Sequence, residues 1–250
     1  MLKRIIPSLL LRGGRLVKGV TYTDHRDAGR PETTARAHNA QGADELLLID
    51  IDASREQREP DLASVASVAR SCFMPLTVGG NIRTIETAQR CMNAGADKIC
   101  LTSTALDDPG LIGRLAHVFG AQAIVIGIDV MSTPGGRKLY DHRTGKSVPG
   151  LIWTEWLKRA VGEGAGEVRL MAVDREGTRS GLDMTLLGEA SNLVEVPIIL
   201  EGGAGSLDQV ADAMRNGADA VALGTMLVFS DNNIFKVKSF LKNAGLEMRL

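Results

Sequence analysis

The chain has 250 residues, of which 44% are hydrophobic and 24% charged, and its formal net charge is −1. A chain of this length and composition is typical of a globular protein that buries a large core in one domain. Neither charge sign is concentrated in a block, and no apolar run approaches the roughly 20 residues of a membrane helix, so neither nucleic acid nor a membrane is expected as a partner.

Eight short apolar runs alternate with segments of helical periodicity along the chain. The runs predict β-strands at residues 4–9, 45–50, 76–78, 98–101, 123–129, 167–173, 197–201 and 220–223. The clearest helices between them span residues 84–93 and 207–216, where apolar side chains recur on one face. Parallel strands joined by crossover helices are typical of α/β proteins, and eight such units predict a (β/α)8 TIM barrel that forms a single domain over residues 1–250.

Similar motifs recur in the same order in the two halves of the chain. Their offsets are 122, 123 and 122 residues. Such a repeat predicts two duplicated half-barrels, at about residues 1–120 and 121–250. The matched pairs are Gly42-Ala43 with Gly164-Ala165, Gly79-Gly80 with Gly202-Gly203, and Gly95-Ala96-Asp97 with Gly217-Ala218-Asp219.

The three cysteines, Cys72, Cys91 and Cys100, form no CxxC pair and no cluster with histidine. An odd number of isolated cysteines indicates reduced thiols and therefore a cytoplasmic protein. The four histidines are scattered without the spacing of metal ligands, so neither a metal nor another cofactor is expected.

Glycine pairs and hydroxyl side chains follow strands in both halves, at the ends where a TIM barrel holds its active site. Glycine lets backbone N–H groups approach an oxyanion closely, and hydroxyls add donors. A lone glycine pair is more often an ordinary turn, but its repetition in both halves favours two phosphate sites on one face. The candidate residues are Gly79, Gly80, Asn81, Thr102, Ser103 and Thr104 in the first half and Gly202, Gly203, Gly224 and Thr225 in the second.

Carboxylates at strand ends are candidate acids, bases or substrate ligands, with helix capping as the alternative role. Asp129 ends the predicted fifth strand, and a long loop rather than a helix follows, so we expect it to be catalytic. In the half-barrel repeat its counterpart is Leu10, where an acid would be expected. The candidate substrate-binding residues at other strand ends are Asp50, Asp174, Gly177 and Thr178.

Several longer motifs are specific. They are Lys3-Arg4-Ile5-Ile6-Pro7, Gly14-Arg15-Leu16-Val17-Lys18-Gly19, Arg26-Asp27-Ala28-Gly29, Gly42-Ala43-Asp44-Glu45-Leu46 and Asp174-Arg175-Glu176-Gly177-Thr178 with Ser180-Gly181. Through them the whole chain resembles the cyclase subunit of imidazole glycerol phosphate synthase, in the HisA/HisF family of histidine biosynthesis. The Arg-Asp-Ala-Gly motif favours the cyclase over its isomerase sister. The resemblance implies a heterodimer in which a glutaminase docks at the N-terminal face of the barrel and supplies ammonia for a bisphosphorylated substrate at the other face.

The resemblance also implies two catalytic carboxylates, on the first and fifth strands. Asp129 matches the second, whereas Leu10 occupies the place of the first. Leucine cannot transfer a proton, and general acid–base catalysis contributes roughly 10² to 10⁴ in rate, so we expect the parent cyclisation to be impaired. Lys18 matches a lysine of the family's active site and is a second catalytic candidate.

The ammonia-handling side is implied to be intact. Asp97 matches a residue at the glutaminase interface, although its Gly-Ala-Asp context recurs at Asp219, so a turn role also explains it. A ring of salt bridges that only seals the barrel is the alternative interpretation of the charged residues at its floor. The residues that match the family's ammonia gate are Arg4, Glu45, Lys98 and Glu167.

Two long segments follow strands. Gly13-Gly14 and Gly29 bracket a first loop that is a candidate mobile lid. Residues 131–149 are expected to form the hairpin-like insertion that the family carries after its fifth strand.

Together these features favour an ammonia-dependent synthase subunit that acts with a glutaminase on a phosphorylated acceptor. Because paralogs resembling this cyclase occur in bacterial surface-polysaccharide clusters, amidination of a nucleotide-linked sugar in lipopolysaccharide biosynthesis is the leading diverged assignment. Two alternatives stay open. One is a non-catalytic, phosphate-ligand-binding or scaffold subunit of an amidotransferase complex, and the other is a sugar-phosphate isomerase like those of the sister family.

Overall fold

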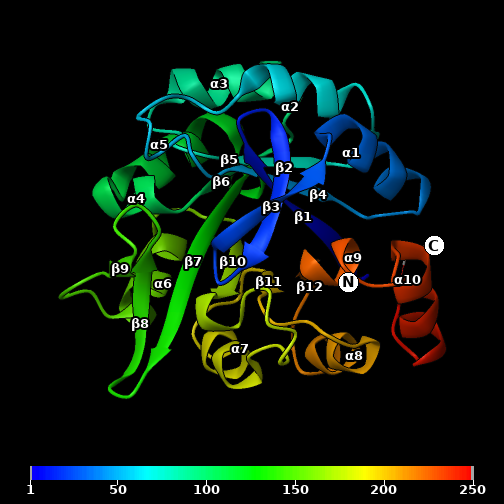
Figure 1. Ribbon diagram of the computed structural model, residues 1–250. Coiled ribbons are helices and arrows are strands. Elements are labelled where there is room, and N and C mark those ends of the chain that lie inside the picture. The colour runs from blue at the N-terminus through cyan, green and yellow to red at the C-terminus, as the bar shows by residue number, and fades with distance from the viewer. Residues whose placement is uncertain (1, 249–250) are drawn as a thin grey trace.

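Eight parallel strands close into a barrel in the computed structural model, which describes residues 2–248. Around the barrel each strand pairs with the next, and the last returns to the first, while the helices lie outside (Figure 1). The predicted (β/α)8 TIM barrel is therefore confirmed. The barrel strands are β1 (Arg4–Arg12), β4 (Leu46–Asp50), β5 (Leu76–Gly79), β6 (Lys98–Leu101), β7 (Ile124–Thr133), β10 (Glu167–Ala172), β11 (Ile198–Glu201) and β12 (Ala220–Leu223).

The helices follow the strands and cover the outside of the barrel. Two of them, α3 and α8, occupy the segments predicted from periodicity, and their N-caps Thr84 and Ser206 have nearly identical backbone angles. No helix within residues 2–248 is both long and apolar enough to span a membrane. The helices are α1 (Pro31–Ala40), α2 (Leu62–Ala69), α3 (Ile85–Asn93), α4 (Ser103–Asp107), α5 (Gly110–Phe119), α6 (Trp153–Gly162), α7 (Met184–Ser191), α8 (Leu207–Arg215), α9 (Thr225–Val228) and α10 (Ile234–Asn243), with short 3₁₀ turns at Ala121–Ala123 and Val173–Arg175.

Two hairpins extend the barrel at its upper rim, which is the end where the barrel strands have their C-termini. The segment predicted as a loose first loop instead forms the antiparallel strands β2 (Arg15–Val20) and β3 (Thr23–Gly29), which continue from β1. Its turn is tied to the far side of the rim, because Thr21 N donates to Glu176 O at 2.9 Å. The expected hairpin insertion is present as β8 (Gly136–Asp141) and β9 (Lys146–Ser147).

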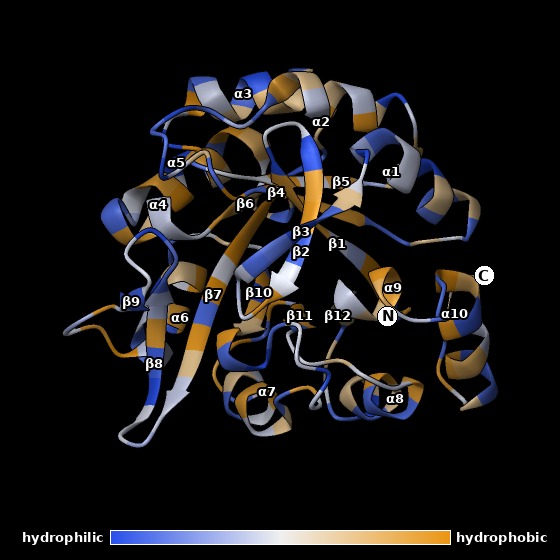
Figure 2. Ribbon diagram, viewed as in Figure 1, coloured by the Kyte–Doolittle hydropathy of each residue, from blue (hydrophilic) through white to orange (hydrophobic). Residues whose placement is uncertain are grey.

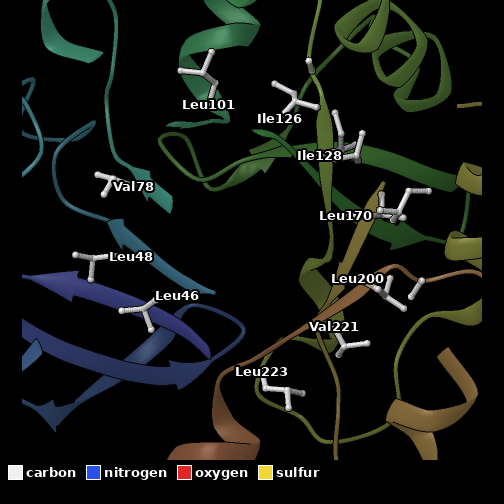
Figure 3. Close-up of a cluster of buried hydrophobic side chains, with 14 of the residues drawn as sticks. Leu46, Leu48, Val78, Leu101, Ile126, Ile128, Leu170, Leu200, Val221 and Leu223 are labelled. Atoms are coloured by element: carbon white, nitrogen blue, oxygen red, sulfur yellow. The ribbon is translucent and has the colours of Figure 1, made fainter. Parts of the chain in front are cut away.

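The outward-facing strand residues form the main core between barrel and helices. Figure 3 shows part of this cluster, and Figure 2 shows hydrophobic residues concentrated on the barrel strands while the helices carry both hydrophobic and hydrophilic residues. Because successive strand residues point to opposite faces, the alternate positions face the barrel interior. The labelled residues of the outer cluster are Leu46, Leu48, Val78, Leu101, Ile126, Ile128, Leu170, Leu200, Val221 and Leu223.

A second, smaller cluster fills the barrel interior. Its members come from six strands and alternate along the chain with residues of the outer core, as the period of two requires. This apolar layer separates the floor of the barrel from its mouth. Its buried residues are Ile6, Leu47, Cys100, Val125, Ile199, Ala220 and Ala222.

The repeated Gly-Ala-Asp motif has the same structural role in both halves. Asp97 Oδ2 accepts a hydrogen bond from Leu76 N at 2.8 Å, and Asp219 Oδ2 accepts one from Ile198 N at 3.0 Å. Each aspartate therefore satisfies the first backbone N–H of the neighbouring parallel strand, which no helix or sheet partner would otherwise reach.

Replacing Asp219 with alanine should lower the free energy of unfolding by about 1–3 kcal/mol, because the buried N–H of Ile198 loses its acceptor. Asp219→Asn keeps an acceptor oxygen and should cost clearly less. Urea unfolding of both variants measures the difference. Equal losses in the two variants would contradict the hydrogen-bonding role of the carboxylate.

Candidate active site

The C-terminal ends of the barrel strands surround a cavity of about 830 Å³, counted with its open mouth. Leu10 and Asp129 both line it, so the position where an acid is missing and the remaining carboxylate share one site. The predicted residues of the first half that line this cavity are Asp50, Gly79, Gly80, Asn81, Thr102, Ser103 and Thr104.

The glycines at the two predicted phosphate sites are required by close backbone packing. A Cβ added to Gly80, which has φ +128°, would lie 2.7 Å from Asp50 O. A Cβ added to Gly202, with φ +101°, would lie 2.5 Å from Ala172 O. The fold therefore requires glycine at both places whether or not an anion binds there. Whether each site can bind a phosphate depends instead on the charged side chains around it.

Asp50 is held by groups of the protein itself. Arg58 Nη1 lies 2.6 Å from one carboxylate oxygen, and Asp61 N donates to the same oxygen at 3.0 Å. Asp50 is buried, and this ion pair neutralises its charge at the cavity wall. It therefore orders the loop after β4 without repelling an anion.

Asp129 is buried in the wall of the cavity and has two cationic or protonatable neighbours. The expectation that it ends its strand is wrong, because β7 continues to Thr133 and pairs with β8. His142 Nε2, from the β8–β9 hairpin, lies 2.9 Å from Asp129 Oδ2. Arg169 Nη1 lies 3.4 Å from Oδ1. Burial opposes ionisation, but His142 and Arg169 hold the pKa of Asp129 below its usual value, so near neutral pH the group is a carboxylate that can accept a proton.

A buried arginine joins Asp129 to a second carboxylate. Arg169 Nε donates to Glu201 Oε2 at 2.5 Å, and both side chains are buried. Gly127 lies directly beside Arg169 in the sheet and adds no side chain. Neither Arg169 nor Glu201 was predicted from the sequence as a site residue. The available signal was the period of two, since Arg169 follows the floor residue Glu167 by two positions and must also face inward.

A separate, smaller hollow lies at the second predicted phosphate site. Gly177, Gly202, Gly203, Gly224 and Thr225 line it, together with Lys18, Glu176 and Glu201. Lys18 therefore does not share the cavity of Asp129, the other predicted catalytic residue. Its buried ammonium is paired with Glu176. Burial lowers the pKa of Lys18 to about 8, although Glu201 opposes the shift.

Two predicted substrate residues line neither hollow. Asp174 Oδ1 accepts a hydrogen bond from Ser132 N at 3.2 Å, and Thr178 Oγ1 donates to Arg175 O at 2.8 Å. The structure thus gives both residues local roles in ordering the loop after β10.

The four charged residues at the floor form a closed ring of alternating sign. Arg4 bridges Glu45 and Glu167, with both N–O distances at 2.5 Å. Lys98 Nζ bridges the same two carboxylates from the other side, both at 2.9 Å. Burial alone would lower the pKa of Lys98, but Glu167 and Glu45 raise it above its usual value. Lys98 therefore stays charged, and the four side chains close the floor of the barrel.

The model of the histidine biosynthesis protein family matches residues 4–233. The chain belongs to this family. Among its relatives, the imidazole glycerol phosphate synthase subunit HisF of Alkaliphilus metalliredigens (strain QYMF) is 42% identical over 248 residues, which cover 99% of this chain and 98% of that protein.

The chain combines the closed floor ring with a cavity in which a leucine stands where an acid was expected. Leu10 is buried at the cavity wall, and the buried cation beside Asp129 is Arg169. His142 was missed as a site residue because it reaches Asp129 from a hairpin, and neither its spacing nor its neighbours in sequence indicate that contact.

Removing the guanidinium by Arg169→Met should lower the free energy of unfolding by about 3–5 kcal/mol, because Asp129 and Glu201 would stay buried without their cation. The double variant Arg169→Met, Glu201→Gln should recover part of this loss. Urea unfolding measures both. Arg70→Met, at an exposed residue, is the control and should change the value by less than about 0.5 kcal/mol. A loss in Arg169→Met no larger than in the control would contradict the bridging role.

Proposed function

We propose that this protein is the ammonia-using synthase subunit of a glutamine amidotransferase and acts on a phosphorylated acceptor. Its relative at 42% identity is named as an imidazole glycerol phosphate synthase subunit. The observation that carries the proposal is that one barrel combines a closed ring of charges at its floor with an arginine-lined cavity at its mouth.

The interior of the barrel is suited to neutral ammonia. Between the floor ring and Asp129 lies the apolar layer that includes Ile6, Leu47 and Val125. Charged ammonium would lose its hydration there without a counterion, which costs far more than the loss of hydration of uncharged ammonia. Passage requires that the ring and the packed layer above it open, and a glutaminase docked at the floor would supply the ammonia.

The floor also presents apolar side chains to a partner. Phe73 is 96% exposed, and Leu2 is 50% exposed. Both precede barrel strands, β5 and β1, and so lie at the N-terminal face. Exposed large apolar groups together with the Asp97 turn give this face the features of a protein interface, and we place the glutaminase here.

At the mouth, the acceptor's phosphate binds by the Gly79–Gly80 end, and Asp129 is the proton acceptor for incoming ammonia. A general base needs to lie near the reacting atom, and Asp129 is an ionised carboxylate in the cavity wall that shares its cation, Arg169, with Glu201. His142, 2.9 Å from Asp129, can relay that proton to the cavity.

Leu10 separates this protein from the parent reaction. With an apolar side chain in place of the first-strand acid, cyclisation of the parent bisphosphorylated ribonucleotide should fall by roughly 10² to 10⁴. We therefore put forward amidination of a nucleotide-linked sugar in lipopolysaccharide biosynthesis in the cytoplasm. In this reaction ammonia bonds to the carbonyl carbon of an acetamido group, and the carbonyl oxygen leaves as water. A non-catalytic scaffold would bind the acceptor without turning it over, and an isomerase would act without ammonia.

The deciding experiment incubates the full chain with a high concentration of ammonium salt and each acceptor, the parent ribonucleotide or a nucleotide-linked sugar. Ammonium-dependent product formation is expected with the sugar. Asp129→Asn removes the proton acceptor and should lower the rate by about 10² to 10⁴. Binding without turnover of either acceptor supports the scaffold instead, and turnover independent of ammonium supports the isomerase.

Removing one cation of the floor ring by Lys98→Met should change glutamine-dependent and ammonium-dependent turnover differently. Loss of Lys98 leaves Glu45 and Glu167 underpaired at the entrance, so transfer of ammonia from a docked glutaminase should be lowered several-fold, whereas free ammonium that enters at the mouth should work almost as before. Both rates are measured by product formation with the glutaminase present. Equal reductions would contradict passage through the barrel.

A further inference from the structure

The two hollows of the barrel mouth differ in charge. The larger one is lined by four arginines and two aspartates. Both aspartates are paired, Asp50 with Arg58 and Asp129 with Arg169. Two more of the arginines are paired with carboxylates outside the lining, Arg12 with Asp52 and Arg143 with Asp141. Within residues 2–248, Arg55 has no carboxylate within 4 Å, and its guanidinium donates only to His142 O at 3.2 Å. This hollow therefore attracts an anion. The four arginines are Arg12, Arg55, Arg143 and Arg169.

The smaller hollow presents a different set of charges. Its charged lining residues are Lys18, Glu176 and Glu201, and all three are paired within the protein. Lys18 is not free to pair with a ligand, because its ammonium is held by Glu176. Glu201 directly precedes the glycine pair, and its buried carboxylate is paired with Arg169. A phosphate placed in this hollow would therefore find no unpaired cation among these lining residues and would lie close to two carboxylates.

The same hollow keeps groups that suit an uncharged ligand. Thr225 Oγ1 is a buried atom without a hydrogen-bond partner in the described chain. The Lys18 side chain lies against the backbone of Gly224, since a Cβ added there would be 3.0 Å from Lys18 Cε. A hydroxyl or amide of a ligand can donate to the Glu201 carboxylate and pair with Thr225, whereas an oxyanion can use only the latter.

We propose that the acceptor site is one-sided, which means that it binds a phosphate or diphosphate at the Gly79–Gly80 end only. The Gly202–Gly203 hollow binds an uncharged, hydroxyl-rich end of the acceptor, because Glu201 lines it and Glu176 holds the Lys18 ammonium. This inference rests on the proposed synthase function and deepens it. The acceptor is then a phosphate ester with its negative charge at one end, unlike a bisphosphate with a phosphate at each end. The glycine repeat predicted two equivalent phosphate sites, and the charges favour only the first.

Crystals of the full chain soaked in sodium sulfate test where an oxyanion binds. In the wild-type protein, sulfate should occupy the Gly79–Gly80 end alone. In Glu201→Gln, which removes one charge and keeps the side chain's shape, a second sulfate should appear beside Gly202 and Gly203. Glu195→Gln makes the same change of net charge at an exposed residue and should match the wild type.

A titration with fructose 6-phosphate and fructose 1,6-bisphosphate gives the matching affinities. The two sugars should bind the wild type about equally, and Glu201→Gln should favour the bisphosphate by about tenfold. If Glu201→Gln does not fold, Glu176→Gln decides, because it frees Lys18 at the same hollow. Sulfate at the second hollow of the wild type, sulfate at neither end, or folded glutamine variants without a second sulfate would overturn the proposal. These binding measurements need no ammonia, so an absence of ammonium-dependent turnover would count against the proposed function and leave the one-sided site standing.

Discussion

The closure of eight parallel strands into a narrow barrel determines which side chains can act together in this protein. Strand residues point alternately inward and outward, so each strand contributes one series of side chains to the interior and another to the helices. The inward series stack in three levels: the Arg4–Glu45–Lys98–Glu167 ring, the apolar layer around Ile6 and Val125, and the group formed by Asp129, Arg169 and Glu201. The chemistry of this protein depends on these three levels of inward-facing side chains.

The charged levels are held by pairing, and the apolar layer keeps them apart. At the floor two cations and two anions alternate, so the ring is neutral as a whole. Above the layer one guanidinium serves two carboxylates, and the second hollow adds Lys18 with Glu176. Burying a charged side chain is costly unless the charge is paired, and this cost keeps each of these side chains in one orientation. Asp129 is thereby fixed at the cavity wall, with only His142 coming from a hairpin outside the barrel.

Much of this arrangement could be predicted from the sequence, for physical reasons that also explain the failures. Runs such as residues 124–130 are mostly apolar because both of their faces are buried, so the eight barrel strands could be located. The strand Thr23–Gly29 is largely exposed and polar, and it therefore gave no such signal. The glycine pairs located the mouth of the barrel correctly, but backbone packing requires Gly80 and Gly202 alike, and so they could not tell an anion site from its counterpart. That distinction depends on Arg169 and Glu201, whose pairing arises only when β10 and β11 lie side by side.

The bridge made by Arg169 has a consequence for the history of the protein. Asp129, Arg169 and Glu201 come from three strands, β7, β10 and β11. A substitution at any one of these residues therefore alters the environment of the other two. Losing the arginine first would leave two buried carboxylates without their shared cation, and losing the carboxylates first would leave a buried cation unpaired. Drift at these sites is therefore constrained to concerted or compensated steps, and homologues should retain or replace this trio as a unit.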